Sequence, residues 1–593
     1  MPLTTYQQLL SKYSAEYAAL NKKLGWLSFI RLILFVSVIG FGYYYFTRHE
    51  AYWLIISLSL FGIFFYSIHL YQRIKDKADF TKALIDINKS EIEFLNGQPS
   101  SHADGKEYID THHPYSYDLD IFGEGSLYGF LNRTTTSFGK NKLAEALLHP
   151  ATNEIKERQE AIKELSGKIN FRQHIQAYGS LHVIEQKDMD QLKTWLGFPR
   201  VFIKPVYYYL LLIFPVATLS ALAFYILSGT TRDLNIFSGL FILNFFITAL
   251  FLKKILKQVS VSTVIGNVLE QFSLQLKDTE SQSFRSSLLQ KLQNNLKHDT
   301  VTAAKSIQQL ASLFKYLDFI INPVMSGLLN GLCLFHIHIL FALDKWKKKN
   351  DAEVMNWLNI IGEFESLNCF ANLGFNNPGY CYPEITNEEI ITASQMAHPL
   401  IRKEKSISND ISFKQEKFIV LTGSNMSGKS TFLRTLGINL VLARAGSVVC
   451  AKSFTLFPFD LYVSMRITDS LQDSESFFYA ELKRLQEIIQ HLEAKNKTFV
   501  MLDEILRGTN SNDKHSGTIG LIRKLVASKA CGIIATHDLT VAELSSEHPG
   551  YMGNKCFESE IINNELTFDY KLKDGVCTKL NASFLMKKMG VID

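Results

Sequence analysis

The sequence predicts an α/β domain with a mostly parallel sheet at its C-terminal end, preceded by an all-helical region that two apolar helical hairpins interrupt. Two observations support this prediction. A glycine-containing loop, LTGSNMSGKST at residues 421–431, lies between an apolar run of strand type and a stretch with helical periodicity. Closer to the N-terminus, four apolar runs each approach the roughly 20 residues that cross the hydrocarbon of a bilayer.

The composition is that of a folded chain with several domains. Its 593 residues exceed what one hydrophobic core usually organises, so we expect two to four domains. With 20% charged and 47% hydrophobic residues, the chain is not disordered. A net charge of +5 neither indicates nor excludes a nucleic-acid partner. The seven scattered cysteines form no CxxC pair, so we expect reduced thiols and no zinc site.

The first predicted hairpin, hairpin 1, covers residues 25–72. Arg31 is the only charge from Leu27 to Phe46, and its long stem can reach the headgroups. Residues 52–71 carry no Asp, Glu, Lys or Arg, and the link TRHEA between the two runs is short. The chain therefore returns to the side from which it started.

The second predicted hairpin, hairpin 2, covers residues 206–252, with the link GTTRD between its two runs. Basic residues flank both hairpins: Lys22, Lys23, Arg73, Lys75, Lys77, Lys204, Lys253, Lys254 and Lys257. Such flanks face the cytoplasm by the positive-inside tendency. We therefore expect a multi-pass protein of the cytoplasmic membrane, with the lipid bilayer as a partner and the α/β domain on the cytoplasmic side. The alternative is a pair of hairpins buried in a protein core.

A fifth apolar stretch, Phe319 to Leu343, carries no formal charge. Asn322, Pro323 and His336 make it a poor lipid-facing helix, and a fifth crossing would move the rest of the chain to the other side. We therefore expect a buried helix whose histidines are packing residues.

The loop at residues 421–431 has the composition of a phosphate-binding loop. Gly423 and Gly428 let the backbone turn its amides toward phosphates, Lys429 would reach the β and γ phosphates, and Ser430 would hold Mg²⁺. ATP and Mg²⁺ are therefore the expected ligands. The expected nucleotide contacts are Gly423, Ser424, Asn425, Met426, Ser427, Gly428, Lys429, Ser430 and Thr431.

Two further strand-like runs end in residues suited to phosphoryl chemistry. TFVMLDE ends in Asp503, which would bind the magnesium shell, and Glu504, which would orient and activate the attacking water. CGIIATHD carries His537, placed to sense the γ-phosphate. Together with Lys429, these three residues form the expected catalytic set.

Five blocks in chain order resemble the ATPase domain of the MutS mismatch-repair family: TGSNMSGKSTFLRT, AGSVVCA, SMRITDSLQDSESFFYAELKR, LDEILRGTNSND and ATHD. The resemblance implies a MutS/ABC-type P-loop ATPase. It also implies that Ser476 touches the γ-phosphate bound by the opposite subunit, so that a homodimer carries composite ATP sites. Ser424 stands where proline is common in the family, and Ser427 and Leu506 stand where glycine is common.

The resemblance extends upstream through residues 120–150, 154–165 and 363–375, which are similar to the family's core and lever region. We expect the following divisions: a cytoplasmic amphipathic segment at 1–24, hairpin 1 at 25–72, a linker at 73–117, the first core and lever part at 118–205, hairpin 2 at 206–252, the second core and lever part at 253–395, and the ATPase domain at 396–593.

DNA is a possible partner of such a protein. The family's mismatch reader inserts a Phe-x-Glu motif beside a mispaired base, and we find no such motif in the first 117 residues. Lysines at 345 and 347–349 could meet a phosphate backbone or anionic headgroups. The leading hypothesis is a membrane-anchored ATPase that couples ATP to lever movement, on mismatched or branched DNA. The alternatives are a membrane or protein partner in place of DNA, an ATP-driven transporter, or a scaffold with a degenerate nucleotide site.

Overall fold

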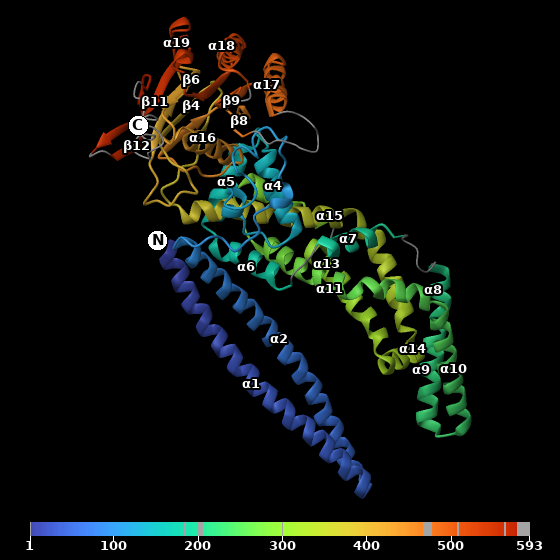
Figure 1. The fold of residues 1–593 in the computed structure, drawn as a ribbon. Helices are drawn as coiled ribbons and strands as arrows, with labels where there is room; N and C mark the ends of the chain where they lie inside the picture. Colours follow the sequence, from blue (N-terminus) through green and yellow to red (C-terminus); the bar gives the residue numbers. More distant parts are fainter. Residues whose placement is uncertain are drawn as a thin grey trace.

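The computed structural model describes residues 2–182, 186–198, 205–298, 301–466, 477–506, 509–562 and 565–577. An α/β domain lies at one end of the molecule, helices form the middle, and two separate helical hairpins project away from the α/β domain (Figure 1).

Hairpin 1 is the apolar part of two longer helices, α1 (Pro2–Arg48) and α2 (Ala51–Leu95). Both helices continue well beyond their apolar runs, so the base of the hairpin is a polar two-helix stalk. The range expected to be a linker, 73–117, is therefore helical as far as Leu95. It stays helical because Ala78, Thr81, Ile85 and Asn88, spaced by three or four residues, are buried where the stalk meets the helical middle.

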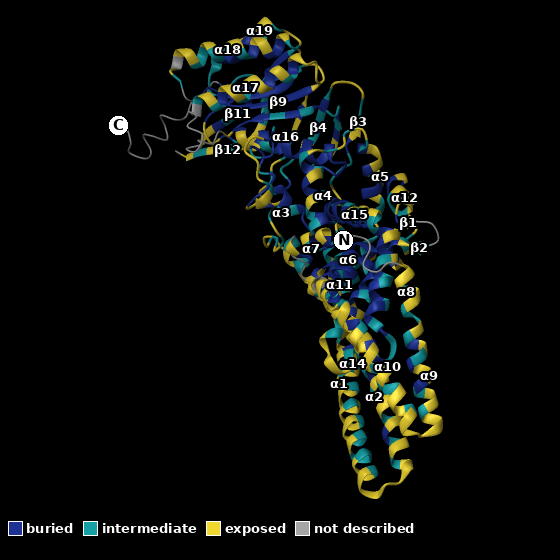
Figure 2. Cartoon of the chain, turned by 90° about the vertical axis from the view of Figure 1, so that its right-hand side faces the viewer, coloured by how far each residue is buried: buried dark blue, intermediate teal, exposed yellow. Residues whose placement is uncertain are grey.

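Hairpin 2 consists of α8 (Pro205–Leu211), α9 (Ile213–Ser228) and α10 (Thr231–Leu250). Gly229 ends α9 with φ 66°, and the Thr230 side chain caps α10 by accepting from the Asp233 amide. Among the described residues, four helical segments are long and apolar enough to cross a membrane: α1, α2, α8 with α9, and α10. The far ends of both hairpins are largely exposed (Figure 2).

The helical middle contains most of the remaining helices: α3 (Leu127–Leu131), α4 (Ser137–Leu148), α5 (Ile155–Ser166), α6 (Ile169–Ser180), α7 (Gln186–Leu196), α11 (Leu252–Ser281), α12 (Ser287–Asn294), α13 (Ala303–Leu317) and α15 (Phe335–Asn376), with the 3₁₀ turn η1 (Lys106–Tyr108) and the two-residue strands β1 (Lys297–His298) and β2 (Val301–Thr302). The 42-residue α15 is its central rod and leads to the α/β domain.

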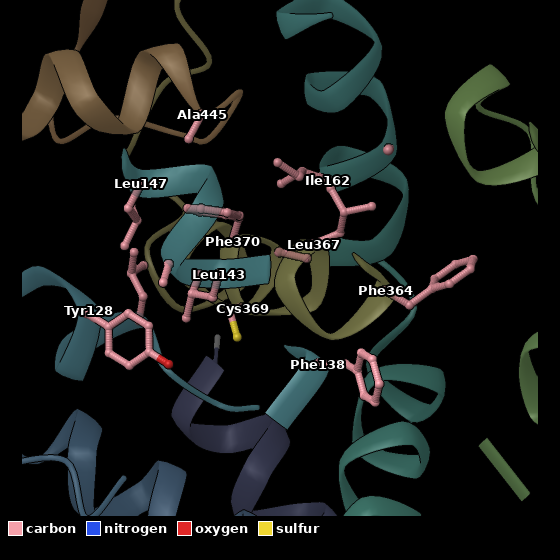
Figure 3. Close-up of a cluster of buried hydrophobic side chains, with 14 of the residues drawn as sticks. Tyr128, Phe138, Leu143, Leu147, Ile162, Phe364, Leu367, Cys369, Phe370 and Ala445 are labelled. Atoms are coloured by element: carbon pink, nitrogen blue, oxygen red, sulfur yellow. The ribbon is translucent and has the colours of Figure 1, made fainter. Parts of the chain in front are cut away.

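Close helix packing fixes α15 in this core. A Cβ atom on Gly362 of α15 would lie 2.7 Å from the backbone carbonyl carbon of Phe138, so α4 and α15 approach at backbone distance. Figure 3 shows the buried cluster around this contact, with labelled side chains Tyr128, Phe138, Leu143, Leu147, Ile162, Phe364, Leu367, Cys369, Phe370 and Ala445. Ala445 directly follows the helix at Lys429–Arg444 of the α/β domain, so this core is continuous with that domain.

The basic cluster of α15 is partly internal. Lys347 is fully buried, and its ammonium donates to the carbonyls of Trp195 (2.6 Å) and Phe198 (2.9 Å) at the C-terminal end of α7. The prediction that Lys347 could meet phosphates is therefore wrong, because this lysine caps a helix inside the core.

The fifth apolar stretch splits into two parts. A 3₁₀ turn, η2 (Asp318–Ile321), and α14 (Pro323–Cys333) are followed by Leu334 in a left-handed conformation (φ 51°), and α15 then leaves at an 80° bend. The prediction of a buried helix holds for the second part, where His336 and Leu340 are fully buried. It is wrong for the first part, because Ile321 is 65% exposed and Val324 is 77% exposed.

The α/β domain contains a six-stranded sheet in the order β12–β11–β6–β10–β9–β8, parallel except for β12. Its strands are β6 (Phe418–Gly423), β8 (Asp460–Ser464), β9 (Thr498–Asp503), β10 (Cys531–Thr536), β11 (Met552–Ile562) and β12 (Glu565–Asp574). Its helices are α16 (Lys429–Arg444), α17 (Phe477–Glu493), α18 (Ser511–Ala527) and α19 (Leu539–Glu547).

A second sheet has the order β3–β7–β4–β5, with β3 (Glu384–Ile385), β4 (Ile391–Met396), β5 (Asn409–Ser412) and β7 (Ser453–Leu456). The predicted α/β domain with a mostly parallel sheet is confirmed.

Candidate nucleotide-binding site

The glycine-containing loop leaves the carboxyl end of β6, a fully buried strand between β10 and β11, and leads into α16. Gly428 caps α16 with φ 102°, and a Cβ atom there would lie 3.0 Å from the Tyr570 ring. Both the backbone conformation and the space therefore require glycine at this position. The loop thus places the N-terminus of a 16-residue helix at the sheet edge, where anions bind.

Lys429 lies folded against this loop. Its buried ammonium donates to the carbonyls of Gly423 (2.8 Å) and Ser424 (3.0 Å) and lies 3.2 Å from Nε2 of His537. Burial lowers the pKa of Lys429, and the charges of Glu504 and Asp503 partly oppose this shift. The lysine is thus held at the carboxyl ends of the strands, where the loop and the acidic residues meet.

The two acidic residues come from the end of β9. Ser430 donates to Oδ2 of Asp503 at 2.6 Å, which joins the start of α16 to β9. Oε1 of Glu504 lies 2.7 Å from Nε2 of His537, which follows the neighbouring strand β10. Glu504 itself has φ 49°, a conformation that a non-glycine residue rarely adopts and that is common at functional sites.

The segment after Glu504 is tied to α17. Leu506 adopts φ 59°, a conformation that suits glycine, and glycine is common at this position in the family that the sequence resembles. The Leu506 amide donates to Oε1 of Glu481 at 2.6 Å. Glu481 is buried and belongs to α17, which continues the block SESFFYAEL. A buried carboxylate thus links the two segments that flank the site.

A cavity of about 500 Å³ joins these groups. Its lining includes most of the predicted site residues: Asn425, Met426, Ser427, Gly428, Lys429, Ser430, Thr431, Asp503, Glu504 and His537. Gly423 and Ser424, also predicted as nucleotide contacts, are not part of this lining, and their carbonyls accept from Lys429. Ser476 lies outside the described residues.

Sequence reasoning missed a second wall of the cavity. It consists of His398, Ile407 and Asn409 from one segment and Phe557 and Tyr570 from β11 and β12. The Asn409 side chain donates to the Tyr570 carbonyl at 3.0 Å, which joins the two segments. Burial and the charge of Arg434 together lower the pKa of His398 to about 4. These residues are far apart in the chain and match no local pattern, so only the fold shows that they belong together.

The lining fits a magnesium nucleotide. Ser430 and Asp503 offer paired oxygen donors of the kind that Mg²⁺ prefers. The loop amides and Lys429 suit phosphate oxygens, and the Tyr570 ring with Ile407 offers an apolar surface for a flat base. Ser427 Oγ is buried and has no hydrogen-bond partner in the described part of the chain, which leaves it available to a ligand. The volume is in the range of about 300–1,000 Å³ that small-ligand sites occupy.

The sheet order and the loop between β6 and α16 define a P-loop nucleotide-binding domain. Comparison with known families agrees: the family model for MutS domain V matches residues 419–587, and that for MutS domain III matches residues 113–323. The chain belongs to the MutS family. Hairpin 2 lies inside the range that matches domain III.

Curated relatives include the DNA mismatch repair protein MutS of Thermotoga maritima, 30% identical over 41% of this chain and 31% of the relative. MutS of Clostridium kluyveri is 28% identical over 38% of this chain and 27% of the relative. The DNA mismatch repair protein MSH3 of Candida glabrata is 32% identical over 38% of this chain and 23% of the relative. The matched part of this chain thus spans less than a third of each relative.

Proposed function

We propose that this protein is a membrane-anchored MutS-type ATPase that binds ATP with Mg²⁺ and hydrolyses it. The observation that carries the proposal is the single cavity in which Lys429, Ser430, Asp503, Glu504 and His537 meet. The MutS family relationship supports the same assignment. This constellation argues against a scaffold with a degenerate site, because all five of these groups meet in one cavity.

Each residue has a distinct role in this proposal. Lys429 and the loop amides bind the phosphates and offset their charge. Ser430 and Asp503 would hold Mg²⁺, which would supply positive charge to offset that of the phosphates. Glu504 orients a water molecule and accepts its proton, while His537, 2.7 Å from Glu504, holds that carboxylate in place and would sense the γ-phosphate.

The proposed anchors are hairpins 1 and 2. Their apolar helices expose their side chains, and burial of such surfaces in lipid removes them from water. Exposed basic residues such as Arg73, Lys253 and Lys254 lie where the apolar runs of the hairpins end, on the side of the helical middle. We infer that these ends face the cytoplasm and that the ATPase domain lies on that side of the cytoplasmic membrane. Two hairpins per chain and a missing LSGGQ-type signature make a transporter the weaker alternative.

We further propose that the working unit is a homodimer with composite ATP sites. The resemblance of SESFFYAEL to the family's signature segment supports a role for Ser476 at the partner's γ-phosphate. Met426, at the tip of the phosphate loop, is 76% exposed and offers an apolar contact to such a partner. ATP would then close the dimer and hydrolysis would reopen it, moving the helical middle.

DNA binding is the second candidate function. The relatives are named as DNA mismatch repair proteins, which supports mismatched or branched DNA as a partner. The burial of Lys347 reduces the basic surface that the sequence suggested for it. A membrane or protein partner is the alternative to DNA.

One experiment separates these functions. ATP turnover by the detergent-purified protein is measured with Mg²⁺ and with EDTA, and with matched, mismatched and branched duplexes across a salt series. We expect turnover that requires Mg²⁺. Salt-sensitive stimulation by DNA would support the second candidate function, and turnover that ignores every duplex would exclude it. Mg²⁺-independent turnover would contradict the proposed site.

A further inference from the structure

The segment between α13 and α15 presents an apolar face that the helical middle leaves uncovered. The face consists of large side chains from η2 and α14: Phe319, Ile321, Val324, Met325 and Leu328, all exposed. No charged residue occurs from Phe319 to Leu343. An uncovered apolar surface of this kind marks contact with a partner or a membrane.

This segment is docked on hairpin 2. The side-chain amide of Asn244 in α10 donates to the carbonyl of Gly331 in α14 and to the hydroxyl of Thr218 in α9, both at 2.9 Å. A Cβ atom on Gly331 would lie 2.3 Å from the Phe241 ring, so α14 and α10 touch at a glycine. Helices inside membranes associate through small residues, which allow close approach, and through polar side chains that hydrogen-bond between helices. The exposed face of α14 is thus continuous with the apolar outside of hairpin 2.

Several polar groups at both ends of α14 are paired within the protein. At the first turn, Oδ1 of Asn322 accepts from the amides of Val324 and Met325 at 3.1 Å, and Pro323 has no amide hydrogen to satisfy. At the other end, the carbonyl and side chain of Asn330 accept from the amides of Leu334 (3.0 Å) and His336 (3.1 Å). Hydrocarbon tolerates backbone polar groups only when they are paired in this way.

The length and connections of α14 exclude a full crossing. Its 11 residues rise about 16 Å, roughly half of the ~30 Å hydrocarbon thickness. The helices on either side, α13 and α15, pack against each other in the helical middle. The chain therefore enters and leaves on the same side.

We propose that η2 and α14 form a re-entrant segment that inserts into the bilayer beside hairpin 2, with its exposed face against lipid acyl chains. This inference rests on the proposed membrane anchoring. It makes the bilayer a direct partner of α15, because α15 begins immediately after the inserted segment and leads to the ATPase domain.

Lipid quenching tests the insertion. An environment-sensitive fluorescent amino acid replaces Val324, Phe224 of hairpin 2, or Tyr479 of the ATPase domain, all exposed, and the full-length protein is reconstituted with brominated phospholipids. We expect quenching at positions 324 and 224 and none at 479. Quenching at 224 alone, as when a second copy of the chain covers α14, would overturn the inference but leave the anchoring intact. Quenching at neither position would overturn the anchoring itself.

A matched pair of glycine variants tests the docking. Gly331→Val places atoms on the Phe241 ring, whereas a Cβ atom on Gly327 of the same helix meets nothing within 4 Å. We expect Gly331→Val to lower the quenching of the probe at 324 to the level at 479 while the probe at 224 stays quenched. Gly327→Val should change neither probe. Equal quenching of the probe at 324 in both variants would overturn the docked geometry.

Discussion

At the scale of single residues, Lys429 is the group whose role is tested most simply. It is buried between two loop carbonyls and faces Asp503 and Glu504, so its charge is positioned before a nucleotide binds. A charged hydrogen bond of this kind contributes about 1.5–3 kcal/mol. We expect Lys429→Ala to weaken ATP binding roughly 10- to 150-fold. Titration with a fluorescent ATP analogue measures this, with Lys452→Ala, an exposed lysine of the same domain, as the control.

Glu481 is a positioning residue in this account. Its carboxylate accepts from the Leu506 amide two residues beyond Glu504, so its loss leaves a buried donor unpaired at a cost of about 1–3 kcal/mol. We expect Glu481→Ala to lower kcat while the KM for ATP changes little, because the ligand-binding loop is untouched. Glu481→Gln keeps an acceptor oxygen and should restore much of kcat. A KM that rises as much as kcat falls would contradict this role.

At the scale of elements, hairpin 1 is held by a buried charged network at the ATPase end of α15. Glu91 of α2 pairs with Arg133 and accepts from the side chains of Asn372 (3.1 Å) and Asn376 (2.9 Å) of α15. The Tyr6 hydroxyl of α1 donates to the same two asparagines. Both helices of the stalk are thus hydrogen-bonded to one short stretch of α15.

Removing one partner from this network should release the stalk. Glu91→Ala leaves Arg133 buried without its carboxylate, and breaking such a pair costs about 3–5 kcal/mol. We expect faster proteolytic cleavage at the base of α1 and α2 and a lower denaturation midpoint. The double variant Glu91→Gln with Arg133→Met should recover part of the loss. Stability equal to the wild type in Glu91→Ala would show that the network does not anchor the hairpin.

The pair of Glu91 and Arg133 also makes the stability of the fold depend on pH. Burial by itself would raise the pKa of Glu91, but the charge of Arg133 and the hydrogen bonds to the carboxylate outweigh it, so the pKa is lowered from 4.5. A lowered pKa means that the carboxylate stabilises the fold at pH values above 4.5. This contribution is lost as the pH falls through the lowered pKa.

Sequence patterns predicted the local features of these elements and missed those that depend on distant contacts. The phosphate loop and the strands that end at Asp503 and His537 were predicted because strand, loop and helix signals are adjacent in the chain. Lys347 looked like a surface charge because its carbonyl partners at Trp195 and Phe198 are about 150 residues away. Tyr570 gave no signal, since an aromatic residue in a strand is ordinary until the fold places it at the cavity.

At the scale of the whole molecule, α15 connects the two helical hairpins with the α/β domain. Its 42 residues span about 63 Å. The stalk of hairpin 1 grips the end nearest the ATPase domain, and hairpin 2 with α14 lies at the other end. Movement of the ATPase domain would therefore act on the two hairpins differently, and under the proposed membrane anchoring this difference couples ATP to the membrane.

A dimer closed by ATP is the expected state when hydrolysis is blocked. Glu504→Gln keeps Lys429 and the loop but removes the base, so ATP should remain bound and hold two subunits together. We expect a dimer with ATP and Mg²⁺ in this variant and a smaller dimer fraction without nucleotide, measured by mass photometry in detergent. Lys429→Ala serves as the control, because its weaker binding should leave it largely free of nucleotide at an ATP concentration that just saturates Glu504→Gln. A dimer fraction that is the same with and without nucleotide in both variants would argue against composite sites.

The most direct test of the account is steady-state ATP turnover by the full-length protein in liposomes, measured side by side for the wild type and Glu504→Gln. A general base contributes about 10²- to 10⁴-fold, so the variant should lose at least two orders of magnitude in turnover while it still binds ATP. Equal turnover in the two proteins would contradict the assignment of Glu504 and, with it, the proposed ATPase site.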